Sequence, residues 1–246
     1  MMYLIAWVVV FVGFNGVAWA QLRAGDVAVI AYTTEGTDSF AWVGFRDMPS
    51  NTVIHFTSSS VSNGWFRWGD HLGRAVGPGP LTWTATNLVK AGTVISWVSG
   101  TPKCWTVGAI SGGVPSLSFS GDQIFAYTGS IVSNSAGTAP WIGDAGPATL
   151  LFGLNFANGG WDNITGGGGT SYIPAGLSTN NATAVHAGLS RNAWYSGPLA
   201  GSASEIRAAL ACPGNWTDTT NAVIPSFWSG GFKVRPTGGG MMIQIE

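Results

Sequence analysis

Short apolar segments of four to eight residues alternate with clusters of Gly, Ser, Asn and Pro along most of this 246-residue chain. Runs of this length bounded by turn residues are typical of β-strands, and they are too short for most helices. The segments at 26–33 and 39–46 are close enough to form a hairpin. The pattern therefore predicts an all-β chain, a single antiparallel β-sandwich, with strands near residues 26–33, 39–46, 52–57, 81–84, 93–98, 123–127, 148–154 and 231–235.

One segment, residues 202–211, has a helical pattern instead. Ser202 followed three residues later by Glu205 is a capping box, and Ile206 and Leu210 lie four residues apart on one face. Pro213 ends the segment. We expect one short helix near the C-terminal third, packed on the sandwich.

The first twenty residues are apolar and end in Ala18-Trp19-Ala20, a small-x-small cleavage pattern. Residues 1–20 are therefore predicted to be a signal peptide, and residues 21–246 a single β-sandwich domain. An uncleaved membrane anchor is the alternative, because no Lys or Arg precedes the apolar run. No later segment is long and apolar enough to span a bilayer. We expect a protein that is secreted or at the cell surface.

Charged residues are scarce, at 9% of the chain with a formal net charge of −1. Without a basic surface, nucleic acid and anionic membranes are disfavoured partners. The 37 Gly are compatible with disorder, but 46% hydrophobic residues and 13 Trp indicate a folded chain with a substantial core.

Cys104 and Cys212 are the only cysteines. In an exported protein an even pair most simply forms a disulfide, with two buried thiols as the alternative. The histidines His55, His71 and His186 are not spaced as zinc ligands. The N-glycosylation acceptor pattern Asn-x-Thr occurs at Asn163, Asn181 and Asn215. It is relevant only if the host is a eukaryote.

A set of motifs resembles an uncharacterised bacterial extracellular module that occurs beside secreted nucleases, phosphatases and sorting-signal or calcium-repeat proteins. That module is itself loosely similar to lamin-tail-like β-sandwich domains. The resemblance implies an exported β-sandwich that is usually an accessory of a larger protein. It identifies no catalytic residue in this chain. The matching stretches are Gly25-Asp-Val-Ala-Val-Ile-Ala-Tyr, Asp38-Ser-Phe-Ala-Trp-Val, Thr52-Val-Ile-His-Phe-Thr, Leu81-Thr-Trp-Thr, Ala91-Gly-Thr-Val-Ile, Ser120-Gly-Asp-Gln-Ile-Phe-Ala-Tyr, Gly160-Trp-Asp, Ile173-Pro-Ala-Gly-Leu and Pro213-Gly-Asn-Trp-Thr.

The residues offer little reaction chemistry. No Gly-x-Ser-x-Gly nucleophile elbow accompanies the histidines. The acids Asp26, Glu35, Asp38 and Asp47 cluster around the first hairpin, where turn chemistry explains them more simply than a glycosidase pair. We expect no catalytic residue and no cofactor, with calcium as the one candidate metal and Glu35 and Asp38 as its candidate ligands.

The most site-like cluster is the aromatic segment that contains Trp65, Phe66, Trp68 and Asp70. Aromatic rings stack on the apolar face of a sugar while charged groups bind its hydroxyls, so Trp65, Trp68 and Asp70 are candidate ligand-binding residues. Core packing is the competing explanation, and most of the tryptophans are expected to fill the sandwich.

These features favour a non-catalytic secreted or cell-surface protein that binds glycan or a protein partner in an extracellular matrix, wall or adhesive layer. One alternative is a self-assembling structural subunit, in which sheet edges pair between copies into filaments or layers. The other is a glycan hydrolase that uses the acids of the first hairpin.

Overall fold

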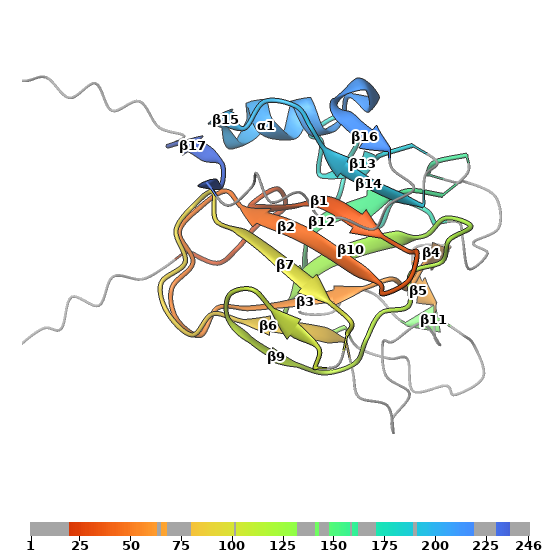
Figure 1. Cartoon of the computed structure of the whole chain (residues 1–246), viewed down its shortest axis with the longest axis horizontal. Helices are drawn as coiled ribbons and strands as arrows, with labels where there is room; N and C mark the ends of the chain where they lie inside the picture. The colour runs from red at the N-terminus through yellow and green to blue at the C-terminus, as the bar shows by residue number, and fades with distance from the viewer. Residues whose placement is uncertain are drawn as a thin grey trace, which may run out of the picture.

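Two six-stranded sheets pack face to face, with one short helix beside them (Figure 1). The predicted all-β sandwich is therefore confirmed. The structure is a computed structural model, and it describes residues 20–62, 65–67, 80–100, 102–131, 141–142, 148–157, 159–161, 171–188, 191–218 and 230–236.

The first sheet is antiparallel throughout and is centred on the predicted hairpin. Its Cα register pairs Val27 with Gly44 and Thr33 with Ser39, with a bulge between Val29 and Ala31. Both hairpin strands are completely buried, which explains their nearly unbroken apolar sequence. The strand order is β16 (Trp216–Asp218), β14 (Asn192–Tyr195), β1 (Val27–Thr33), β2 (Ser39–Gly44), β7 (Val94–Val98) and β8 (Cys104–Trp105).

The second sheet contains one parallel pair, β12 with β13, and is otherwise antiparallel. In β3 the apolar Ile54 and Phe56 are buried, while Val53 is exposed and His55 is half-buried. This alternation follows from one face of the strand packing on the core. The strand order is β13 (Ala184–His186), β12 (Thr149–Asn155), β10 (Gln123–Thr128), β3 (Val53–Thr57), β6 (Leu81–Thr84) and β9 (Ala109–Ser111).

The other strands of the described residues form two small sheets. One joins β4 (Val61–Ser62), β5 (Trp65–Arg67) and β11 (Trp141–Ile142) in antiparallel pairs. The other pairs β15 (Ala200–Ser202) in parallel with β17 (Lys233–Arg235). Both bring together segments that are far apart in the sequence.

Aromatic side chains from both sheets meet in the core between them. Trp42 of β2 contacts Trp83 of β6 edge-to-face, with ring centroids 4.9 Å apart. Phe40 of β2 packs on Phe56 of β3, with centroids 5.1 Å apart. Such contacts add to the area that each ring buries. The expectation that most tryptophans fill the sandwich is confirmed for five of those described, namely Trp42, Trp83, Trp97, Trp105 and Trp216.

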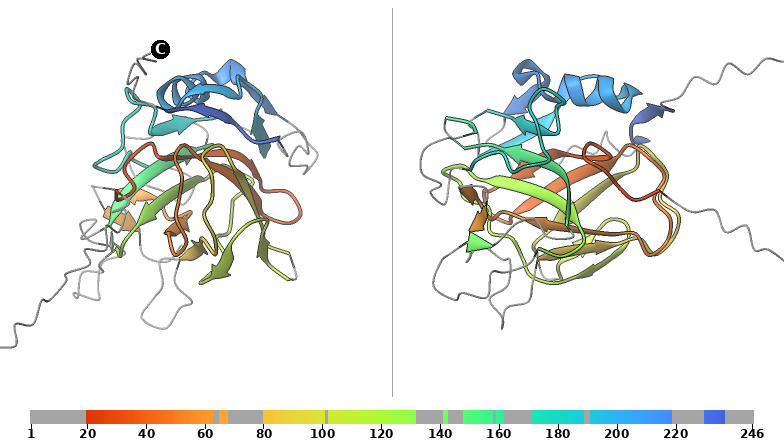
Figure 2. Two further views of the ribbon diagram at one scale, coloured as in Figure 1. Left: turned by 90° about the vertical axis from the view of Figure 1, so that its left-hand side faces the viewer. Right: turned by 180° about the vertical axis from the view of Figure 1, so that it is seen from behind.

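The predicted helix is α1 (Ala203–Leu210), and both halves of its capping box are present. Its Ile206 and Leu210 are buried in the main core. The helix lies across one end of the sandwich, beside β13 of the second sheet and β14 and β16 of the first (Figure 1 and Figure 2). The chain then forms a 3₁₀ turn, Pro213–Asn215, before β16. The helix prediction is confirmed, including its end before Pro213.

The predicted Cys104–Cys212 disulfide is wrong, because both thiols are free and exposed. Cys104 lies in β8 at one edge of the first sheet, and Cys212 precedes β16 at the other edge. Five strand spacings of about 4.8 Å place those edges about 24 Å apart. A disulfide needs Cα atoms within about 7 Å. The buried-thiol alternative fails as well.

The predicted signal peptide falls on residues that the structure does not describe. Up to residue 19 it lies outside the described residues, and it stays a prediction. Among the residues that are described, no helix has the length and apolar character needed to cross a membrane.

Candidate functional site

The predicted aromatic cluster is only partly within the structure. Trp65 begins β5, but its side chain is not described, and Trp68 and Asp70 lie outside the described residues. Of the glycosylation candidates, Asn163 also lies outside them. Asn181 is exposed on a turn, and Asn215 Nδ2 donates a 2.8 Å hydrogen bond to the Ala209 carbonyl.

The four hairpin acids are separated into two groups by the length of β1. Asp26 and Asp47 lie at one end, where each forms an ion pair, with Arg46 and Lys90 respectively. The bonds from Lys90 and from the Ala91 amide lower the pKa of Asp47. Seven residues at about 3.3 Å each place the turn between β1 and β2 about 23 Å away. Asp26 and Asp47 therefore stabilise the fold through their ion pairs.

At the turn end, Glu35 belongs to a hydrogen-bond network with residues at the start of β14, the strand that pairs with β1. Its Oε1 accepts from Arg191 Nη1 at 2.5 Å, and its Oε2 accepts from Asn192 Nδ2 at 3.4 Å. Asn192 Oδ1 in turn accepts from the backbone N–H of Thr34 at 3.0 Å. Because Asn192 belongs to β14, the pairing of β14 with β1 places Arg191 beside Glu35.

Asp38 holds a neighbouring loop through a hydrogen bond. Its Oδ2 accepts from the backbone N–H of Leu117 at 2.9 Å. The same loop is closed by a bond from the Ser118 amide to Asp122 Oδ2 at 3.0 Å. These two carboxylates fix the segment that carries Phe119 between β9 and β10.

Phe119 is 64% exposed, more than the other exposed large hydrophobic side chains of the described residues. The Arg191 guanidinium carbon lies 5.6 Å from the centroid of its ring. A shallow hollow of about 430 Å³ is lined by Thr34, Glu35, Gly36, Phe119 and Arg191. We call these five residues the hairpin-end site. It presents an exposed aromatic ring beside an ion pair.

The two predicted calcium ligands thus have other partners. Glu35 pairs with a guanidinium, and Asp38 accepts from a backbone amide. Within the described part of the chain, no group of three or more His, Cys, Asp or Glu side chains is arranged to hold a metal ion. A calcium ion at Glu35 would have to displace Arg191.

The histidines that the structure describes are held by local contacts. His55 Nδ1 lies 2.8 Å from Thr82 Oγ1, and burial lowers the pKa of its ring. His186 Nε2 lies 3.1 Å from the Ala157 carbonyl oxygen. Both histidines lie in strands of the second sheet, His55 in β3 and His186 in β13.

The hairpin-end site combines predicted and missed residues. The sequence pointed to Glu35 and Asp38 but assigned them to a cation. It missed Phe119 and Arg191, which come from segments distant in sequence. The available signal was an aromatic residue in the turn Ser118-Phe119-Ser120-Gly121, where polar residues are usual.

Comparison with known proteins adds no relative: no model of a protein family matches the chain. No curated protein and no solved structure matches it either. The resemblance to a bacterial extracellular module stays a prediction.

Proposed function

We propose that this chain is an exported, non-catalytic β-sandwich that binds glycan in an extracellular matrix, wall or adhesive layer. The observation that carries the proposal is the exposed ring of Phe119 beside the Glu35–Arg191 ion pair. Exposed aromatic rings next to polar groups are the usual composition of a surface that recognises sugars.

The ring provides the apolar half of the interaction. A pyranose presents a face of C–H groups that packs on a flat aromatic surface and removes both from water. Phe119 is suited to this because its loop is already held by Asp38 and Asp122, so little ordering is needed on binding. The hollow is shallow, as a chain of sugar residues lying along a surface requires.

The ion pair provides the polar half. The side chains of Arg191 and Glu35 are 60% and 31% exposed, so donor N–H groups and acceptor oxygens lie at the rim of the hollow. A sugar hydroxyl both donates and accepts, and it can bond to each partner. Because the pair has no net charge, we propose a neutral sugar at this site.

The test is an array of neutral and acidic polysaccharides probed with the purified chain, followed by titration of the best ligand. Phe119→Ala is expected to weaken binding about tenfold, equivalent to about 1.4 kcal/mol, while Phe119→Trp retains it. Leu88→Ala is the matched control, since Leu88 is 45% exposed and lies outside the hairpin-end site. Absence of binding to every polysaccharide, or equal affinity of the Phe119→Ala variant and the unaltered chain, would overturn the proposal.

A further inference from the structure

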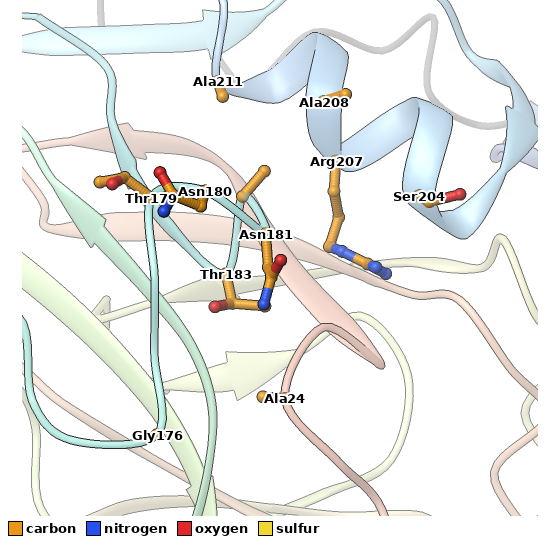
Figure 3. A pocket seen from close by; sticks show the side chains of 11 residues that line it. Ala24, Gly176, Thr179, Asn180, Asn181, Thr183, Ser204, Arg207, Ala208 and Ala211 are labelled. Atoms are coloured by element: carbon orange, nitrogen blue, oxygen red, sulfur yellow. The ribbon is translucent and has the colours of Figure 1, made fainter.

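A second hollow, of about 530 Å³, lies between α1 and the turn that precedes β13. Arg207 descends from α1 toward Ala24, with Asn181 on the opposite wall (Figure 3). None of its lining residues belongs to the hairpin-end site. We call this hollow the helix pocket.

Arg207 is the one charged residue among the described residues that line the helix pocket. It is half-buried, and no carboxylate of the described residues lies within ion-pair distance of it. Asp26 acts on Arg207 only from a distance, because its carboxylate is bonded to Arg46 and to the Arg23 amide. A cation removed from water without a counter-ion is costly. Burial accordingly lowers the pKa of Arg207.

The guanidinium is fixed in place by the backbone below it. Arg207 Nη1 donates a 2.7 Å hydrogen bond to the Gly25 carbonyl, and Nε is enclosed with no acceptor among the described residues. A Cβ on Gly25, whose φ is +87°, would lie 2.8 Å from the Arg207 Cζ. Only glycine therefore allows this close approach. The cation is held in position before any ligand arrives.

The other lining residues are uncharged, and half of them have polar side chains. Thr179, Asn180, Asn181 and Ser204 are exposed, and their hydroxyl and amide groups can both donate and accept. The small side chains of Ala208 in α1 and of Ala211 at its C-cap leave room in the pocket. A fixed guanidinium surrounded by hydroxyls and amides matches a ligand that carries one carboxylate and several hydroxyls.

We infer that the helix pocket binds a uronic acid residue, with its carboxylate on Arg207 and its ring hydroxyls on Asn180, Asn181 and Ser204. The carboxylate supplies a counter-ion in direct contact with the guanidinium, which no carboxylate of the described residues provides. The site is separate from the neutral-sugar site at Phe119, so either can fail without the other.

Calorimetric titration of the full chain with three probes tests this inference: D-glucuronate, D-glucose and acetate. D-glucuronate is expected to bind saturably, and D-glucose, which lacks the carboxylate, at least about tenfold more weakly. Acetate, which lacks the hydroxyls, is also expected to bind more weakly. Acetate binding as tight as D-glucuronate would overturn the uronic acid assignment, and so would failure of D-glucuronate to bind.

Two variants locate the site without disturbing the core. Asn181→Asp places a carboxylate opposite Arg207 at an exposed position and is expected to weaken D-glucuronate binding about tenfold. Asn87→Asp, also exposed but outside the helix pocket, adds the same charge and is expected to leave it unchanged. Phe119→Ala is likewise expected to leave it unchanged. Equal effects of the two Asn→Asp substitutions would overturn the inference.

Discussion

Replacing Trp83 and Trp42 one at a time by phenylalanine is expected to destabilise the protein by very different amounts. Both side chains are fully buried, and their rings touch each other. Each substitution removes the same atoms, so the loss of packing is similar. The difference lies in the indole N–H. Trp83 Nε1 donates a 2.7 Å bond to the Val107 carbonyl, whereas Trp42 Nε1 has no acceptor among the described residues.

The magnitude follows from those two donors. Trp83→Phe loses a hydrogen bond with a net contribution of about 1 kcal/mol. Trp42→Phe removes a buried donor whose lack of a partner costs about 1–3 kcal/mol. The free energy of unfolding should therefore be about 2–4 kcal/mol lower for Trp83→Phe than for Trp42→Phe.

Equilibrium unfolding in guanidinium chloride, followed by circular dichroism, measures this difference directly, provided that the m-values agree. Trp97→Phe is a third variant, because Trp97 is also fully buried with an unpartnered Nε1. It should resemble Trp42→Phe. If Trp42→Phe were as destabilising as Trp83→Phe, the reasoning from the hydrogen bonds would be refuted.

Three further outcomes are expected. Without reductant, Ellman's reagent should titrate both Cys104 and Cys212 in the folded protein; no reaction would contradict two exposed thiols. Since the pKa of His55 is lower in the folded state than its ordinary value of 6.5, the folded protein binds fewer protons. Stability should fall as the pH drops below about 6.5, and His55→Gln should flatten that part of the stability profile measured by thermal unfolding. Gly92→Ala should reduce the soluble yield and the melting temperature sharply, because its φ is +86° and a Cβ would overlap the Phe232 carbonyl oxygen. A melting temperature equal to that of the unaltered chain would contradict this clash.

Patterns within a few consecutive residues predicted several strands and the helix. The hairpin of β1 and β2, strand β6 and helix α1 were found because apolar runs and a capping box are visible within a few residues. Strands β8 and β14 were missed, since β8 has only two residues and the Asn-Ala-Trp-Tyr sequence of β14 does not alternate between polar and apolar residues. Their pairing depends on partners elsewhere in the chain.

The same limit explains the errors about sites. The disulfide prediction needed the strand order, which places the two cysteines at opposite edges of one sheet. Glu35 and Asp38 were singled out from the turn sequence as candidate metal ligands, but their partners Arg191 and Leu117 come from other segments. The residue types indicated that charged side chains lie near the turn. Their hydrogen-bond and ion-pair partners could be identified only from the tertiary structure.

The pairing of Thr33 with Asn192 also has a consequence for how the protein is made. One side of β1 finds its neighbour β2 at once, but the other side stays open until most of the polypeptide has been synthesised. High contact order of this kind slows folding to milliseconds or seconds. During synthesis, the first sheet therefore lacks the strand that pairs with one side of β1 until β14 has been made. A truncation before residue 192 would leave β1 as an unpaired edge strand that can pair with other chains.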